Sequence, residues 1–392
     1  MVISDVSSVG DINKYAVLKE VRDHDGITRE EISRILKLSV PAVTKNINSL
    51  LQAGIIYEKD IVDTSKGRKP SLLYCNYDFI YIIGAMIMPD GIRVVLCDYS
   101  GKIIKEVSSN SEIEISSLTA INNLLNSIDE VIESVKEKNK IKQICLASPG
   151  AGEGAIEFNL LSDYQKDWIN IDLRSIIYER FKIPVVVRND VEMSLIGERW
   201  KGSGKDTKNL VLCKYGEGFA SRAMIDDHLF VGENKIAGDI GLYVGDYDEG
   251  KKRFSLPGSL ENKLCLTLED RYTRYGGETD TSKKKINLKW LIDQENKGDK
   301  VAGHVIHSLL RNVAVVITNS VIILNPKVVI LSGYAAYLNQ EDLDIIIKFV
   351  NSNCPYPPEI RISYLKDYDC LYGCIKTAID MAEDEFVEIW KG

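Results

Sequence analysis

The chain of 392 residues lacks any run of the roughly 18 consecutive apolar residues that a membrane-spanning helix needs. Its first residues, Met1 to Asp11, have neither the basic start nor the apolar segment of a secretory signal. Its eight cysteines lie inside apolar stretches, such as those around Cys97 and Cys145, and not in the spacing of a disulfide framework. We therefore expect a cytoplasmic protein with reduced thiols and no membrane-bound part.

Strong positive charge is also lacking. The net charge of −8 excludes a nucleic-acid-binding surface over the whole chain, although a small DNA-binding module fits inside an acidic average. Residues 1–75 carry 11 basic and 10 acidic side chains, a net charge of +1, which leaves −9 for the remainder. The composition, with 45% hydrophobic and 27% charged residues, is that of ordinary globular domains, and the length predicts about two or three of them.

Three short helices are predicted within the first 60 residues. The first ends at Asp25-Gly26, and the second begins at Thr28, where Thr-Arg-Glu-Glu has the form of a capping box. Ser39 is a suitable N-cap for the third, whose Pro41 falls in the first turn, where proline is tolerated. We expect these apolar residues to face inward: Val17, Leu18, Val21, Ile32, Ile35, Leu36, Val43, Ile47, Leu50 and Leu51.

The third helix leaves short and polar side chains outward, as a helix that enters the DNA major groove must. Beyond it, the segments 55–59 and 72–74 predict two strands around a basic tip at 65–70, a wing that places an arginine in the minor groove. The predicted DNA-contacting residues are Ser39, Ala42, Thr44, Lys45, Asn48, Lys66, Arg68 and Lys69. The alternative is a small helical protein-interaction domain, which the agreement of caps, helix spacing and wing disfavours.

From Asp78 onward, strands followed by helices predict an α/β body. Three strands in a meander, at 80–88, 92–98 and 102–107, precede a helix at 118–138 and buried strands at 141–146 and 183–187. A second round begins with strands near 210–215 and 223–225 and ends with a strand at 328–331. Polar residues directly after apolar strands mark the ligand-binding edge of such a sheet.

Six short motifs stand in the order that is typical of the ROK family of repressors and sugar kinases. They are Ser148-Pro149-Gly150, residues 168–173, Arg188-Asn189-Asp190, Gly197-Glu198-Arg199-Trp200, residues 237–241 and residues 324–333. Together with the winged helix, the chain resembles the transcriptional-regulator branch of this family. The resemblance implies two actin-like, ribonuclease-H-like lobes around a sugar-binding cleft, in homodimers or homotetramers. The implied domains are a winged helix at 1–76, a first lobe at 77–190 completed by a C-terminal helix at 375–392, and a second lobe at 191–374.

The chain departs from the family kinases at both phosphate-binding loops. The first turn reads Ala85 to Asp90 in place of Asp-x-Gly-Gly-Thr, so the glycines that let backbone approach phosphate are absent. In the second loop, Glu217 would repel a triphosphate and Arg222 replaces a glycine. We therefore expect no kinase activity, although a carbohydrate kinase stays the main alternative.

The zinc ligands that the resemblance implies are also missing. Leu242 stands in place of the histidine, and residues 247–260 contain neither cysteine nor histidine. Cys370 and Cys374 have a helix-face spacing, but we interpret them as core residues, and we interpret His304 and His307 as structural. No metal and no other cofactor are expected.

The resemblance places a sugar-binding site at Asn189, Asp190, Asp239 and Glu261, with Arg222 as a further candidate. Carboxylate and amide groups suit sugar hydroxyls because they accept hydrogen bonds in fixed directions. Two alternatives stay open: Asn189-Asp190 only caps a helix, or Arg222 pairs with an acidic effector. We expect a non-enzymatic repressor of carbohydrate-related genes that binds a double-stranded DNA operator and a sugar-like effector, with an effector-independent DNA-binding protein as a second alternative.

Overall fold

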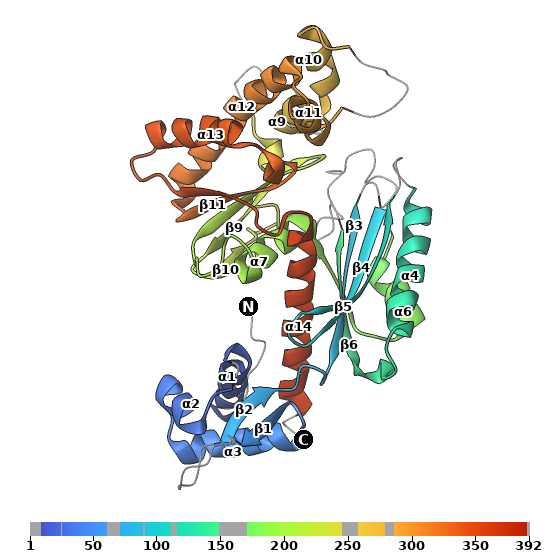
Figure 1. Ribbon diagram of the computed structural model, residues 1–392, viewed down its shortest axis with the longest axis vertical. Coiled ribbons are helices and arrows are strands. Elements are labelled where there is room, and N and C mark those ends of the chain that lie inside the picture. The colour runs from blue at the N-terminus through green and yellow to red at the C-terminus, as the bar shows by residue number, and fades with distance from the viewer. Residues whose placement is uncertain are drawn as a thin grey trace.

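The computed structural model describes residues 9–24, 26–60, 71–88, 91–110, 116–148, 171–244, 258–278 and 286–389. Figure 1 shows three parts: a small helical domain with a hairpin at one end, and two α/β lobes at the other. The long helix α14 (Asp369–Ile389) runs from the second lobe, alongside the first, to the small domain.

The N-terminal domain contains α1 (Val9–Asp23), α2 (Arg29–Leu36), α3 (Val40–Gln52) and a hairpin of β1 (Ile56–Asp60) and β2 (Ser71–Cys75). The predicted capping box is present, because Thr28 Oγ1 accepts from the backbone of Glu31 while the Glu31 carboxylate accepts from Thr28. Ser39 caps α3. The two strands pair antiparallel, so helix-turn-helix and wing are confirmed. The wing tip, with Lys66, Arg68 and Lys69, lies outside the described residues.

One prediction about the core of this domain is wrong. Ile35 is 47% exposed, whereas Ile32 is fully buried and Leu36 half-buried. A helix turns about 100° per residue, so Ile32 and Leu36 share the inner face and Ile35 falls at its edge. In α3, Val43, Ile47 and Leu50 are buried as expected, and Leu51 is half-buried.

The first lobe has a five-stranded sheet in the order β5-β4-β3-β6-β7. Strands β3 (Tyr81–Met88), β4 (Gly91–Asp98) and β5 (Ile103–Asn110) form the predicted meander, and β6 (Ile141–Ser148) and β7 (Val185–Asn189) add to it in parallel. Helix α4 (Ser117–Glu133), five residues shorter at its end than predicted, packs on β4 and β5. Helix α6 (Leu173–Phe181) contacts β7.

The second lobe repeats this topology, as the sequence predicts. Its sheet order is β10-β9-β8-β11-β12, again a meander followed by two parallel strands. The strands are β8 (Leu210–Tyr215), β9 (Phe219–Ile225), β10 (His228–Phe230), β11 (Val328–Gly333) and β12 (Glu359–Ile362). The helices are α7 (Asp190–Lys201), α9 (Ser259–Glu261), α10 (Leu268–Arg274), α11 (Leu288–Glu295), α12 (Lys300–Leu324) and α13 (Gln340–Asn353), with a 3-10 turn η3 (Ile240–Leu242).

Helix α12 is long and apolar enough to cross a membrane by length and composition alone. Its buried side chains, from Ala302 to Val321, belong to the core of the second lobe, together with α11, α13, β8 and β11. Among the described helices it is the one that passes this test, and its packing is that of a core helix.

The hydrophobic core of the N-terminal domain is continuous with that of the first lobe. Val17, Ile32 and Ile47 of the small domain belong to the same buried cluster as Ile375 and Ile379 of α14. Helix α14 begins at Asp369, six residues before the range expected from the sequence, and packs on α7, β3 and β6. The small domain is therefore docked on the body through apolar contacts as well as through the chain.

Candidate functional site

The outer face of α3 carries the predicted DNA-contacting residues that the structure describes. Lys45 and Asn48 are exposed, as is the cap Ser39, whereas Ala42 and Thr44 are half-buried. In the adjoining hairpin, the rings of Tyr57 and Tyr74 stack at 5.6 Å, and the wing therefore has a rigid base. Exposed polar side chains on a helix next to such a hairpin suit insertion into the major groove.

The candidate effector site begins where β7 passes into α7. Asn189 is the N-cap of α7, and its Oδ1 accepts from the backbone nitrogens of Val191 at 3.0 Å and Glu192 at 3.2 Å. Asp190, the first residue of the helix, accepts from Lys214 Nζ at 3.0 Å, and the same Nζ donates to Ser194 at 3.1 Å. Asn189 thus has the capping role, while the side chain of Asp190 belongs to an ion pair.

Lys214 lies in the apolar strand β8 and is the centre of this first cluster. Burial opposes its charge, but the carboxylates of Asp190 and Asp369 outweigh that effect and raise the pKa of Lys214 well above its usual range. Asp369, the first residue of α14, is itself buried and accepts from the hydroxyl of Ser332. The first cluster, defined as Asp190, Ser194, Lys214 and Asp369, therefore joins β8 to the starts of α7 and α14.

A second cluster lies on the other side of the first turn of α7, because residues two apart on a helix point in nearly opposite directions. Arg222 of β9 is 3% exposed and donates from Nη1 to Asp239 Oδ1 at 2.6 Å. Its Nε lies 3.9 Å from Glu192 Oε1, is buried and donates no hydrogen bond to any of the described residues. Burial raises the pKa of Glu192, although Arg222 opposes the shift.

Glu261 joins the second cluster from α9. Its carboxylate accepts from the backbone of Phe219, and burial, with Asp239 as a lesser cause, raises its pKa. A Cβ at Gly218 would lie 2.5 Å from Glu261 Oε1, so a larger residue there would displace the carboxylate from its present position. The second cluster, Glu192, Arg222, Asp239 and Glu261, thus contains three carboxyl groups: those of Glu192 and Asp239 lie beside the Arg222 guanidinium, and that of Glu261 interacts with Asp239.

Gly238 sets the position of Asp239 in this cluster. It has a φ of +95°, and a Cβ there would lie 2.3 Å from the backbone oxygen of Ser221. The Ser221 backbone nitrogen in turn donates to Gly238 O at 2.7 Å, which fixes the Ala-Gly-Asp-Ile-Gly segment against β9. Only glycine permits this approach, and it brings Asp239 beside Arg222.

The five residues that the sequence predicts for one pocket lie in three different settings in the structure. Arg222, Asp239 and Glu261 come together, Asp190 belongs to the first cluster, and Asn189 caps the helix between them. Lys214 and Glu192 were missed. A lysine inside the apolar run Leu-Val-Leu-Cys-Lys-Tyr was the visible signal for the first, since a buried cation needs partners.

Glu217 lies in the loop between β8 and β9, where the resemblance implies phosphate contacts in the family kinases. Glu217 accepts from Asn287 at 2.7 Å and from the hydroxyl of Tyr334 at 2.8 Å. The eight cysteines are buried free thiols, and burial together with neighbouring Cys145 and Cys370 raises the pKa of Cys374. A protonated thiol is a poor metal ligand.

Helices α7 and α14 touch at two glycines. A Cβ on Gly197 would lie 1.9 Å from the backbone oxygen of Asp369, and one on Gly373 would lie 1.8 Å from that of Met193. The two helices therefore meet backbone to backbone, and no other residue type fits at either position without displacing one helix.

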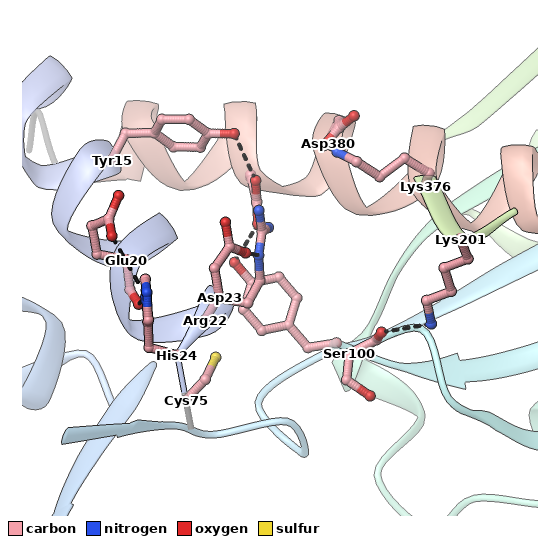
Figure 2. Close-up of polar contacts among 12 residues, drawn as sticks. Tyr15, Glu20, Arg22, Asp23, His24, Cys75, Ser100, Lys201, Lys376 and Asp380 are labelled. Carbon is pink, nitrogen blue, oxygen red and sulfur yellow. Dashed lines mark hydrogen bonds and ion pairs between the residues drawn. The ribbon is translucent and has the colours of Figure 1, made fainter. Parts of the chain in front are cut away.

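The far end of α14 carries a buried carboxylate that joins it to the N-terminal domain. Figure 2 shows Tyr15 and Arg22 of α1 directed toward α14. Glu383, 1% exposed, accepts from Tyr15 at 3.0 Å, from Tyr99 at 2.5 Å and from Arg22. Burial and the Glu383 charge raise the pKa of both tyrosines, so their hydroxyls stay donors. We call Tyr15, Arg22, Tyr99 and Glu383 the docking cluster.

A winged helix-turn-helix docked on two lobes of ribonuclease-H-like topology defines a DNA-binding regulator built on a sugar-kinase-like body. Residues 87–374 match the ROK family, and residues 11–57 match a winged helix-turn-helix DNA-binding domain. The chain belongs to the ROK family.

Relatives and solved structures agree with this assignment. The chain is 27% identical to a xylose repressor of Caldicellulosiruptor bescii, over 94% of this chain and 95% of that one. It is 22% identical to the DNA-binding transcriptional dual regulator NagC of Escherichia coli K12, over 89% of this chain and 87% of NagC. A ROK family transcriptional regulator described as a homologue of the E. coli MLC protein has the same fold, with a TM-score of 0.77, 19% identity and coverage of 97% and 98%. A ROK hexokinase from Thermus thermophilus has a TM-score of 0.61 and 17% identity, and the match covers 78% of this chain and 100% of the hexokinase.

Proposed function

We propose that this protein is a cytoplasmic transcriptional repressor of carbohydrate-related genes, whose effector is a sugar or sugar derivative bound at the second cluster. The observation that carries the proposal is a winged helix-turn-helix docked on a ROK body. The carboxylate of Glu217, in the loop where the resemblance implies phosphate contacts, supports a body that does not bind a triphosphate. Full-length relatives named as xylose repressors, and NagC, support the same function.

The composition of the second cluster favours a neutral polyol over an acidic effector. Three carboxyl groups outnumber the one guanidinium, and Arg222 is already paired with Asp239. Sugar hydroxyls donate to carboxylates and also accept, so one of them is a suitable partner for the buried Nε of Arg222, which donates to nothing in the described residues. A sugar acid would add a fourth negative charge.

The route from effector to DNA runs through α7 and α14 in this proposal. An effector that engages Glu192 displaces the first turn of α7, and α7 is locked to α14 at the glycine crossing. From Asp369 to Glu383, α14 spans 14 residues, roughly 21 Å at the rise of an α-helix. A shift of α14 reaches the docking cluster and thereby changes the position of α3.

Operator release tests the proposal. An operator fragment found by genomic footprinting is bound to the protein, and neutral sugars (xylose and N-acetylglucosamine among them), sugar phosphates and sugar acids are titrated in. A neutral sugar should change DNA affinity, by release or tightening, and sugar acids should not. Asp190→Asn should reduce the response because it weakens the first cluster beside the site, with operator affinity retained. Asp270→Asn, an exposed position on α10, is the matched control, and a full response in Asp190→Asn would contradict a role for the first cluster.

Two alternatives have their own tests. Incubation with ATP, Mg²⁺ and a hexose panel detects a kinase, and clear turnover would overturn the non-enzymatic assignment. A ligand-induced melting-temperature screen separates a sensor from an effector-independent DNA-binding protein, since a ligand that binds the folded state raises its stability.

We also infer a homodimer or homotetramer. Helix α12 exposes the apolar side chains of Val315, Ile322 and Ile323, and Ile323 is 72% exposed. Exposed apolar surface of this kind is typical of contacts between subunits. Two-fold symmetry would match an operator with half-sites about one helical turn, or a multiple of it, apart. Light scattering on the purified protein, with Ile323→Glu as the variant that disrupts the contact, measures the assembly.

A further inference from the structure

Three potential metal ligands from three helices of the second lobe meet at one point. Glu295 is the last residue of α11, His307 lies on α12, and Asp342 lies in the first turn of α13. One ligand atom from each lies within 4.8 Å of the other two. The three residues are 12 and 35 positions apart, so no short sequence motif contains them. The sequence alone therefore favours a structural role for His307.

Asp342 is the least compensated charged group of the three. The residue is 0% exposed, and within the described part of the chain its carboxylate oxygens have no hydrogen-bond partner other than the carboxyl group of Glu295, which donates to them only when it is protonated. His307 Nε2 lies 3.2 Å from Asp342 Oδ1, which places the two side chains in contact without satisfying either oxygen with a directed hydrogen bond. A buried carboxylate in this state is costly unless a cation joins it.

Neighbouring residues hold Glu295 and Asp342 close together. Asn339 donates from Nδ2 to Glu295 Oε2 at 3.2 Å and accepts the Asp342 backbone N–H at 3.0 Å. On α12, Gly303 leaves room for the Glu295 carboxylate, since a Cβ there would lie 2.6 Å from its Oε1. Burial, the Asp342 charge and a side-chain hydrogen bond to Asp342 raise the pKa of Glu295 to about 7, although His307 opposes the shift.

We propose that Glu295, His307 and Asp342 bind a divalent transition-metal cation. One imidazole nitrogen and two carboxylate oxygens form a mixed set that suits Zn²⁺ or Mn²⁺, and solvent fills the remaining positions. His307 and Glu295 are half-buried, so the ion has a path from solvent. The cation would tie the ends of α11 and α13 to the middle of α12. It would lie apart from the two charge clusters and from the cysteines, and it revises the expectation of a metal-free protein.

The test uses the full-length protein after treatment with a chelator. Zn²⁺ and Mn²⁺ are each titrated in, bound metal is measured by elemental analysis after desalting, and the melting temperature is recorded. His307→Asn and Asp342→Asn each remove a ligand. His304→Asn is the matched control, because His304 lies one turn earlier on α12 with an exposed side chain against Tyr275.

One equivalent of metal and a raised melting temperature are expected for the unaltered chain and for His304→Asn. The two ligand variants should bind at least about tenfold more weakly and lose the metal-dependent rise. Asp342→Asn removes a buried charge, so its metal-free form should melt no lower than the unaltered protein. If it nevertheless fails to fold, the half-buried His307 carries the test through His307→Asn. Absence of stoichiometric metal in the unaltered chain would overturn the proposal, as would metal that both variants retain through the cysteines.

Discussion

The DNA-facing helix and the candidate effector site treat their polar groups in opposite ways. On α3, Lys45 and Asn48 are exposed, and within the described residues no ion pair engages Lys45. Around the first turn of α7, Asp190, Lys214 and Arg222 are each paired with an internal partner. We therefore expect the predicted DNA-contacting side chains of α3 to bind without internal rearrangement, whereas an effector at the candidate site would exchange existing contacts for its own.

This difference has an energetic consequence. At the proposed site, an effector that binds Asp239 or Nη1 of Arg222 would replace the ion pair between them, whereas a hydrogen bond to Nε of Arg222 would be new. The net free energy of binding would therefore be smaller than the number of contacts suggests. A ligand shifts a conformational equilibrium only by its differential affinity for the two states. Displaced ion pairs are a suitable source of that difference, because they exist in one state and are rearranged in the other.

Removing the docking carboxylate should have the largest effect on the molecule. Glu383→Gln keeps the shape of the side chain but removes the buried counter-charge of Arg22, which leaves this partly buried guanidinium with only the more exposed Asp23, 3.6 Å away. Loss of one partner of a buried pair costs about 3–5 kcal/mol, so the melting temperature should fall steeply, and proteolysis should release the N-terminal domain.

The control for this experiment is Glu130→Gln, which breaks the exposed pair with Lys105 at 3.0 Å. An exposed pair contributes about 1 kcal/mol at most. Equal destabilisation by the two substitutions would mean that Glu383 contributes no more than a surface ion pair.

The next largest effect is expected at the DNA surface. Lys45→Ala should weaken operator binding by about 1–3 kcal/mol, because an exposed cation on the outer face of α3 contacts phosphate or a guanine edge. Fluorescence anisotropy at physiological salt measures it, with Lys136→Ala, an exposed lysine of the body, as the control. Since the surface needs no internal rearrangement, effector response should be unchanged. Unaltered affinity would remove α3 from the interface.

The smallest effect should come from the helix cap. Asn189→Ala removes the acceptor for two backbone N–H groups, so the free energy of unfolding should fall by about 1 kcal/mol, as urea denaturation would show. Effector response should persist, in contrast with Asp190→Asn. A lost response in Asn189→Ala, with stability unchanged, would indicate that this amide contacts the effector directly.

The sequence was sufficient where contacts are local along the chain. The capping box at Thr28, the Ser39 cap and the hairpin all depend on residues within a few positions of each other, and all are present. The repeated sheet topology followed from strand order and turn positions. Ile35 was assigned to the core because a helix of eight residues has too few turns for its apolar periodicity to define one face.

Contacts between residues far apart in the chain could not be predicted from the sequence. Arg22 and Glu383 are 361 positions apart, and nothing in either segment names the other. The split of the first turn of α7 between two clusters was likewise invisible, since it depends on which cation each carboxylate meets in the folded lobe. Packing of distant segments, and not local propensity, sets these contacts.

Because α14 lies late in the chain, the N-terminal domain is synthesised before the helix on which it docks. A ribosome completes the helix-turn-helix some 300 residues before it makes Glu383, so the nascent DNA-binding domain has neither its buried carboxylate nor the apolar face of Ile375 and Ile379. The small domain can therefore dock only after the ribosome has synthesised α14. A chain that ends before α14 would have an undocked α3 and would lack the helix that, in our proposal, connects α3 to the effector site.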